Sequence, residues 1–167
     1  VKLVKIVSDF AFGNAEIPFT KKKTVIDLFA GSGNLTFPLA ERAGKVIAVE
    51  GQKEAVKRGE AETKEKGIEN IEWIGGEAEW GLKKIFRRNE PLDVLVLDPP
   101  RHGAREILDL IPLLKPRVVV YVSCDPVTLS RDLKELVRRH YRLEKVQPID
   151  MFPQTYHIES VSQLSLV

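Results

Sequence analysis

The sequence VVVYVSCDP at residues 118–126 predicts a buried strand that ends at the only cysteine of the chain. Its β-branched and aromatic residues favour a central strand of a sheet. Asp125-Pro126 then ends the strand and can begin a helix. Ligands bind outside the carboxyl ends of the strands in open α/β sheets. Cys124 is therefore interpreted either as a small buried hydrophobic residue or as a nucleophile.

The composition is typical of a globular protein with one core. The chain has 167 residues, of which 43% are hydrophobic and 30% are charged, and this length is enough for one domain. A net charge of +2 is too small to indicate nucleic-acid binding by itself. A single cysteine excludes an internal disulfide and fits a reducing compartment, so we expect a cytoplasmic protein. No signal peptide is visible and no run reaches the ~18 apolar residues of a membrane span, so no membrane contact is expected.

The first 24 residues differ in pattern from the rest of the chain. Val1 to Val7 alternates weakly, like a strand, and Gly13-Asn14 is typical of a turn. We therefore expect an N-terminal remnant or lead-in segment at residues 1–24, followed by one domain at residues 25–167.

From residue 25 onward, patterns typical of strands alternate with patterns typical of helices. The expected strands before the cysteine strand cover residues 25–29, 45–50, 71–74 and 93–98. The expected helices cover residues 35–42, 52–66, 78–88, 106–114 and 127–139, and Pro112 should interrupt the fourth of them. This alternation predicts an α/β fold with a parallel sheet and helices on both faces. Residues 141–150 and 157–167 are both strand-like, and the gap between them is too short for a crossover helix. They should therefore pair antiparallel.

The turn after the first strand indicates a place where a ligand can approach the backbone. Gly31 and Gly33 allow this approach, and the helix that follows points its amino end there. The third glycine of the dinucleotide fingerprint is missing, since Thr36 stands at its position. Glu50 suits ribose hydroxyl groups, and Glu77 could accept from an adenine amino group.

Four acids occur in or just past four successive strands, at one edge of the predicted sheet. They are Asp27, Glu50, Glu77 and Asp98. Such a ring would repel a pyrophosphate, whereas it would attract a cationic sulfonium. This favours S-adenosylmethionine over NAD as the cofactor. The structural alternative is that these acids only cap helices.

Five segments of the chain resemble, in order, the RNA 5-methyluridine methyltransferases, which are S-adenosylmethionine-dependent enzymes acting on uridines of transfer and ribosomal RNA. The segments are DLFAGSGN at 27–34, VEG at 49–51, LDPPR at 97–101, YVSCDPVTLSRD at 121–132 and DMFPQTYHIES at 150–160. The resemblance covers about residues 25–167. It implies a class I methyltransferase fold, Rossmann-like, with seven strands and an antiparallel C-terminal hairpin.

The resemblance implies three residues for the chemistry on uracil. Cys124 matches the nucleophile that adds to C6 of the ring, and Glu159 matches the base that removes the C5 proton. Asp98 matches the acid that holds the uracil edge near the cofactor. His157 is expected to have a structural or orienting role rather than a catalytic one.

The resemblance also implies a cofactor site and partners. Residues expected at the S-adenosylmethionine site are Phe29, Gly31, Gly33, Asn34, Glu50, Glu77 and Asp98. No metal is implied. The substrate would be transfer or ribosomal RNA. The family's RNA-binding barrel and central domain have no counterpart in these 167 residues, so a separate RNA-binding domain or subunit is an expected partner.

Two departures from the family pattern lead to further expectations. Asp125 stands where the family usually has Asn, and its charge should disfavour a thiolate at Cys124 unless a cation offsets it. Residues 10–14 look like a remnant of a Phe-x-Gln-x-Asn segment that contacts the cofactor in the family. Arg101 and Arg131 could bind phosphate or pair with acids of the fold, and the sequence leaves both alternatives open.

Two other functions remain open at this point. Asp98-Pro99-Pro100 is similar to the loop with which exocyclic-amine methyltransferases hold a base amino group, although Arg101 replaces their aromatic residue. Such an enzyme would not need Cys124 or Glu159. The other alternative is a non-catalytic module that binds S-adenosylmethionine and acts only with a partner chain.

Overall fold

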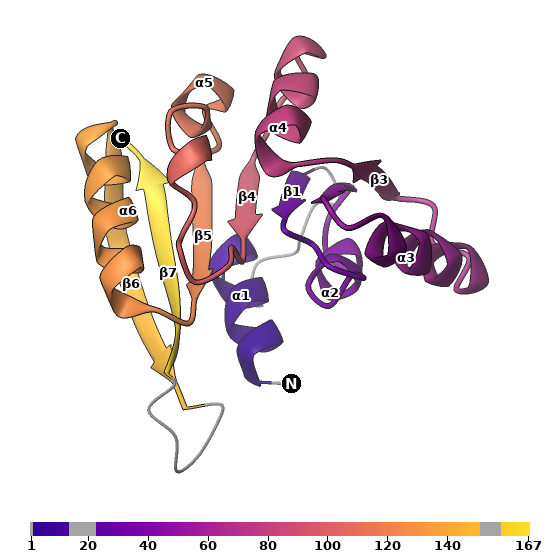
Figure 1. The fold of residues 1–167 in the computed structure, drawn as a ribbon, viewed down its shortest axis with the longest axis horizontal. Helices are drawn as coiled ribbons and strands as arrows, with labels where there is room; N and C mark the ends of the chain where they lie inside the picture. The colour runs from indigo at the N-terminus through magenta and orange to yellow at the C-terminus, as the bar shows by residue number, and fades with distance from the viewer. Residues whose placement is uncertain (1, 14–22, 151–157) are drawn as a thin grey trace.

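A computed structural model describes residues 2–13, 23–150 and 158–167. In these residues, one sheet of seven strands has the order β3-β2-β1-β4-β5-β7-β6 (Figure 1). The strands are β1 Thr24–Leu28, β2 Lys45–Glu50, β3 Ile71–Gly75, β4 Val94–Leu97, β5 Val118–Ser123, β6 Tyr141–Ile149 and β7 Glu159–Leu166. Strands β1 to β5 are parallel, whereas β7 runs antiparallel to both β5 and β6. The predicted α/β sheet with an antiparallel end is confirmed.

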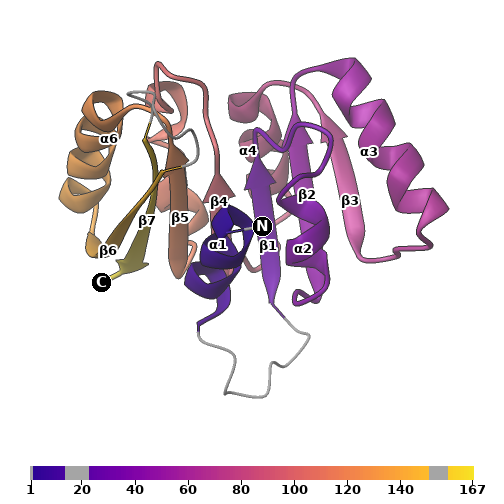
Figure 2. The same ribbon diagram turned by 90° about the horizontal axis from the view of Figure 1, so that it is seen from below.

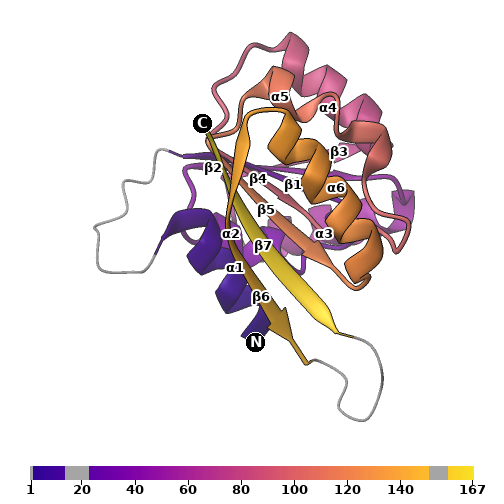
Figure 3. The same cartoon turned by 90° about the vertical axis from the view of Figure 1, so that its left-hand side faces the viewer.

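Helices cover both faces of the sheet, as right-handed crossovers require. They are α1 Lys2–Phe12, α2 Thr36–Ala40, α3 Lys53–Glu65, α4 Ala78–Arg87, α5 Ile111–Leu114 and α6 Pro126–Arg138, with a 3₁₀ turn η1 at Arg105–Ile107. Figures 2 and 3 show α1, α2 and α3 on one face, and α4, α5 and α6 on the other. Within the described ranges, no helix is long and apolar enough to cross a membrane.

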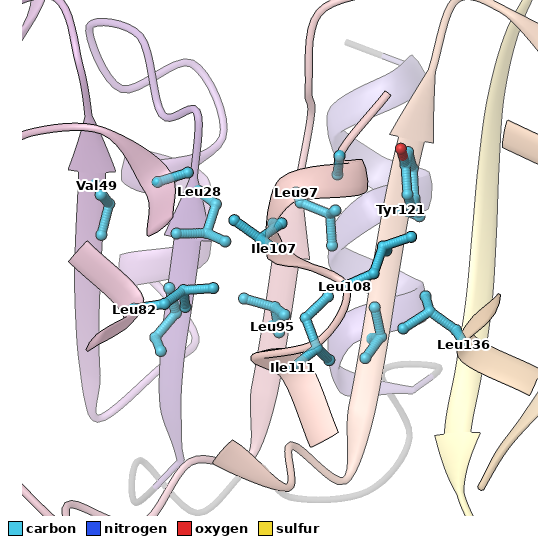
Figure 4. Close-up of a cluster of buried hydrophobic side chains, with 14 of the residues drawn as sticks. Leu28, Val49, Leu82, Leu95, Leu97, Ile107, Leu108, Ile111, Tyr121 and Leu136 are labelled. Carbon is cyan, nitrogen blue, oxygen red and sulfur yellow. The ribbon is translucent and has the colours of Figure 1, made fainter. Parts of the chain in front are cut away.

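Alternate strand residues supply two separate cores. In β1, Ile26 and Leu28 pack toward α4, α5 and α6, whereas Val25 packs toward α1 and α2. Figure 4 shows the first of these cores, in which Leu95 and Leu97 of β4 lie close to Ile107 and Ile111. Because both faces of the central strands are buried, their sequences are almost continuously apolar.

The expectation of a strand at residues 1–7 is wrong. Residues 2–7 begin α1, since the apolar positions Leu3, Val7 and Ala11 recur every four residues and fall on one side of a helix. Val7 and Ala11 are buried in the core beneath α1 and α2. Phe10 and Phe12 belong to this helix, and Asn14, which completes the supposed remnant, lies outside the described residues. The boundary at residue 24 stays a prediction.

The helix expected at residues 106–114 is interrupted. It divides into η1 and α5, and Pro112 is the second residue of α5. Proline has no N–H to donate to the preceding turn, so it suits the start of a helix better than its interior. The chain before α5 therefore forms the 3₁₀ turn η1, in which the Ile107 amide donates to the Ala104 carbonyl at 3.0 Å.

We predict that Gly59→Ala destabilises the fold although alanine favours helices by about 1 kcal/mol. Gly59 lies within α3, and a Cβ there would come 2.3 Å from ring atoms of Trp73. The Trp73 ring is held because its Nε1 donates to Thr63 Oγ1 at 2.9 Å. We expect the free energy of unfolding, measured in urea, to fall by about 1–3 kcal/mol.

The control for this substitution is Glu60→Ala, at the exposed neighbouring position of α3. Its unfolding free energy should stay within about 0.5 kcal/mol of the parent. A Gly59→Ala protein as stable as the parent would contradict the close packing of Trp73 on the helix backbone.

Candidate active site

Five functional candidates fall on one face of the sheet, at its carboxyl edge. Asp27, Glu50 and Glu159 lie in β1, β2 and β7, respectively. Along each strand, residues of the core beneath α4 to α6 point to one face, and these three acids point to the other. Asp98 and Cys124 follow β4 and β5 by one residue and continue the same alternation. This is the face on which α1 and α2 pack. Side chains far apart in sequence are thus brought to one edge.

A cavity of about 390 Å³ lies beside the turn after β1. It is lined by Asp27, Phe29, Ala30, Gly31, Ser32, Asn34, Leu35 and Asp98. Gly31 has φ +56°, and a Cβ there would meet nothing within 4 Å, so its backbone faces open space. Gly33 differs, because a Cβ there would lie 2.5 Å from the Phe37 ring. The sequence predicts both glycines at a ligand; Gly31 lines this cavity, and the place of Gly33 at a ligand stays a prediction.

Phe29 separates this cavity from a second one of about 420 Å³. The second cavity is lined by Phe29, Val49, Glu50, Gly51, Gln52, Glu77, Ala78, Pro100, His102 and Glu106. Phe29 has φ +60°, a left-handed conformation that is strained for a bulky residue. Such strain is concentrated at ligand sites. His102 and Glu106 were missed by the sequence reasoning, because only the fold turns their loop toward β2.

The Glu50 carboxylate joins two loops around these cavities. Its Oε2 accepts from the Gly31 amide at 2.8 Å, and its Oε1 accepts from the Gln52 amide at 2.7 Å. Glu77 lies next to it, since a Cβ at Gly51 would come 3.1 Å from Glu77 Oε1. The two acids that the sequence predicted for ribose and adenine therefore line one cavity.

Asp27 is a buried acid with an unused acceptor. Its pKa is raised to about 7, mainly by burial and also by the charges of Asp98 and Glu50, while the hydrogen bond from Thr36 opposes the rise. Thr36 Oγ1 donates to Asp27 Oδ2 at 2.6 Å. Asp27 Oδ1 has no hydrogen-bond partner among the described residues. Because Asp27 lines the first cavity, this oxygen is suited to accept from a cationic ligand.

Asp98 connects the cavities to the end of β7. Its side chain is exposed at the cavity, yet enough protein surrounds it that desolvation, together with the charge of Glu159, raises its pKa to about 6. Asp98, just past β4, therefore interacts electrostatically with Glu159 at the start of β7.

Cys124 and Glu159 occupy matching positions on neighbouring strands. Ser123 and Ser160 form the last pair of the antiparallel β5–β7 ladder. Cys124 and Glu159 come directly after this pair at the ends of the two strands. Directly opposed residues of an antiparallel pair have Cβ atoms about 5 Å apart. Cys124 is half-buried. A thiol at this edge, beside two acids, fits the nucleophile interpretation better than a residue of the core.

The negative charge next to Cys124 is offset. Asp125 is the N-cap of α6, and its Oδ1 accepts from the amides of Val127 and Thr128, both at 2.9 Å. The bond from the Thr128 amide is the main cause that lowers the pKa of Asp125, and Arg101 contributes as well. Arg101 is therefore a cation that acts on Asp125, and the amides at the N-terminus of α6 add partial positive charge.

Other residues singled out in the sequence have simpler roles or stay untested. Of the two roles considered for Arg131, phosphate binding and pairing with an acid of the fold, the structure shows the second. Arg131 Nε donates to Asp132 Oδ1 at 2.8 Å. His157, and with it the segment at residues 151–157, lies outside the described residues.

Comparison with known proteins agrees with this geometry. The model of the tRNA (uracil-5-)-methyltransferase family matches residues 11–166. The 23S rRNA (uracil(1939)-C(5))-methyltransferases RlmD of Alkalilimnicola ehrlichii and Alcanivorax borkumensis are 45% and 38% identical over 83% and 97% of this chain. The chain spans 31% and 39% of the lengths of these two relatives.

A solved structure also matches. The Pyrococcus abyssi tRNA (uracil-54, C5)-methyltransferase, in complex with S-adenosyl-L-homocysteine, is 28% identical with a TM-score of 0.77. The match covers 98% of this chain and 37% of that chain. The class I methyltransferase fold expected from the sequence is thus confirmed.

We predict that Asp27→Asn stabilises the fold in a pH-dependent way. The pKa of Asp27 rises from an ordinary 3.8 to about 7 on folding. As the pH rises through this window, the unfolded chain loses its proton before the folded chain does, so the wild type loses stability. The advantage of Asp27→Asn should therefore grow from near zero at about pH 4 to about 1–3 kcal/mol at about pH 8.

Urea unfolding at both pH values measures this difference. Glu54→Gln, at an exposed acid in the first turn of α3, is the control and should show no such growth. A constant difference between Asp27→Asn and the wild type would contradict the burial of a raised-pKa carboxyl at the cavity.

Proposed function

The chain belongs to the tRNA (uracil-5-)-methyltransferase family, and from this we propose that it methylates C5 of uridine in RNA with S-adenosylmethionine as the methyl donor. The observation that carries the proposal is the juxtaposition of Cys124, Glu159 and Asp98 beside two cavities lined by acids. A thiol, a base and a further acid are what substitution at C5 of uracil requires.

The residues at the cavities fit the proposed cofactor. Asp27 has an unpartnered buried oxygen for a cationic group, and Gly31 leaves its backbone open to the same cavity. Glu50 can accept from ribose hydroxyls, and Glu77 from the adenine amino group. When bound, S-adenosylmethionine supplies an electrophilic methyl group. The acids around it attract the positive sulfonium and would repel a pyrophosphate.

Cys124 would activate the uracil ring. C5 of uracil is a weak nucleophile, so the thiolate first forms a bond to C6, and the C5–C6 π electrons move toward O4 as an enolate. C5 would then carry enough electron density to attack the methyl group, and the S–CH3 bond of the donor would break to leave S-adenosylhomocysteine. Asp98 is suited to hold the ring, because a pKa of about 6 leaves part of its carboxyl protonated near neutral pH. It can then donate to a uracil carbonyl oxygen.

Glu159 would complete the reaction. It takes the proton from C5, the electron pair of that C–H bond re-forms the C5–C6 double bond, and the C6–S bond breaks to release the Cys124 thiolate. Its position at the start of β7, one residue outside the last ladder pair, supports this role.

The substrate and its binding are part of the proposal. Because the chain spans about a third of its relatives, we propose that a separate RNA-binding domain or subunit supplies most of the affinity for transfer or ribosomal RNA. We place the reaction in the cytoplasm, where those RNAs and a free thiol are both found.

We predict that Cys124→Ala lowers methyl transfer by at least about a thousandfold, because no thiolate can add to C6. RNA lacking 5-methyluridine is incubated with methyl-labelled S-adenosylmethionine, digested, and its labelled nucleosides are identified. Ser130→Ala, on the exposed side of α6, is the control and should keep normal activity.

The labelled nucleoside distinguishes the alternatives. If Cys124→Ala forms labelled 5-methyluridine at the parent rate, the mechanism is refuted. Label in another nucleoside, independent of Cys124, would favour an exocyclic-amine methyltransferase. If the parent protein binds the cofactor but labels no RNA, the chain acts as the non-catalytic module.

We predict that Glu159→Gln accumulates protein covalently attached to RNA. The thiol can still add and the ring can still be methylated, but the C5 proton stays in place, so the C6–S bond cannot be eliminated. The adduct should survive denaturing electrophoresis and disappear in the double variant with Cys124→Ala. Glu159→Gln protein that releases 5-methyluridine at the parent rate would exclude Glu159 as the base.

A further inference from the structure

The loop that begins at Asp98 is bound to α6 through its backbone. Thr128 Oγ1 donates to the Arg101 carbonyl at 2.9 Å. One turn further along α6, Arg131 Nη2 donates to the carbonyl of His102 at 2.8 Å. Two consecutive peptide groups of the loop are thus fixed to one helix.

A buried carboxylate makes the next contact. Asp132 is fully buried, and its Oδ2 accepts from the Ala104 amide at 2.8 Å and from the Tyr121 hydroxyl at 2.7 Å. Its Oδ1 accepts from Nε and Nη2 of Arg131, both at 2.8 Å. This carboxylate therefore joins α6, β5 and the loop. We call the contacts of Tyr121, Thr128, Arg131 and Asp132 with residues 101–104 the Asp132 clamp.

Gly103 lets the loop approach this carboxylate. Its φ is +82°, and a Cβ at this position would lie 2.4 Å from Asp132 Oδ2 and 2.6 Å from Arg131 Nη2. The turn is closed by the Gly103 amide, which donates to the Pro100 carbonyl at 2.8 Å. Only glycine combines this backbone conformation with this proximity.

The clamp connects the two halves of the candidate site. The loop starts at Asp98, and α6 starts at its N-cap Asp125, the residue after Cys124. Binding the loop to the first two turns of α6 therefore fixes Asp98 relative to Cys124. On the basis of the function proposed above, we propose that Tyr121 and Asp132 are positioning residues that set the geometry between the nucleophile and the acid that holds uracil.

Tyr141 provides a control for Tyr121, because its buried hydrogen bond lies far from the candidate site. Tyr141 is an equally buried tyrosine, and its hydroxyl donates to the Pro116 carbonyl at 3.1 Å. This acceptor precedes β5, at the opposite edge of the sheet from Cys124. Tyr121→Phe and Tyr141→Phe each remove one buried hydroxyl group, but only Tyr121→Phe loosens the loop. They form a matched pair.

Steady-state methylation by the intact protein compares the pair. We expect Tyr121→Phe to lower kcat about tenfold or more, because small errors in placement are costly for catalysis, while the Kd for S-adenosylmethionine changes less than about twofold. Tyr141→Phe should lose comparable thermal stability but keep kcat within about twofold. Equal kcat values for the two variants would overturn the proposal.

Thr128 provides a second test that does not alter the core. Thr128→Val removes the hydroxyl that binds the Arg101 carbonyl, whereas Thr128→Ser keeps it. We expect Thr128→Val to lower kcat and Thr128→Ser to restore it to near the parent value. A Thr128→Ser protein as impaired as Thr128→Val would contradict a role for this bond.

Amide hydrogen exchange of residues 101–104 tests the clamp without any methyl transfer. Exchange should accelerate about tenfold or more in Tyr121→Phe and stay unchanged in Tyr141→Phe. Unchanged exchange in both variants overturns the clamp. Accelerated exchange in Tyr121→Phe, with a parent protein that methylates no RNA, supports the clamp and refutes the proposed function instead.

Discussion

The antiparallel register between β5 and β7 is the constraint on which the site depends. Pairing Ser123 with Ser160 places Cys124 and Glu159 at the same edge, although 34 residues separate them in the sequence. A slip of one residue would move Glu159 to the other face of the sheet. The register is held because Val161 and Leu164 are buried in opposite cores, so β7 cannot shift without exposing both. Hydrophobic packing on two faces thus sets the spacing of the proposed nucleophile and base.

The acids of the site are retained at a cost in stability. Asp27 and Asp98 have raised pKa values. Burial is the largest cause for both, and a neighbouring acid adds to the rise in each case. Such a cluster destabilises the folded chain at neutral pH, and a bound cation would relieve it. Asp125 shows the opposite arrangement, since helix amides and Arg101 offset its charge beside Cys124. The charge pattern therefore favours a cationic cofactor beside Asp27 and Asp98, and leaves the charge of Asp125 offset beside Cys124.

Local patterns were enough to predict the sheet, but not the features that depend on long-range contacts. The run at residues 118–123 and the short gap after residue 150 predicted the central strand and the hairpin. The helix at Lys2–Phe12 was missed because its apolar side was read with a period of two. The close approach of the Phe37 ring to Gly33 depends on the fold as well, and the sequence pattern gave no sign of it. Asp132 and Tyr121 are 11 residues apart and meet Ala104 across three elements, which no local pattern encodes.

The most direct test of the account is the release of tritium from RNA that carries uridine labelled at C5. Substitution at C5 through Cys124 and Glu159 replaces that hydrogen, so one tritium should enter water for each methyl group transferred, and both should be lost in Cys124→Ala. Methyl transfer without tritium release would show that the methyl group goes to another atom, and would contradict the proposed reaction.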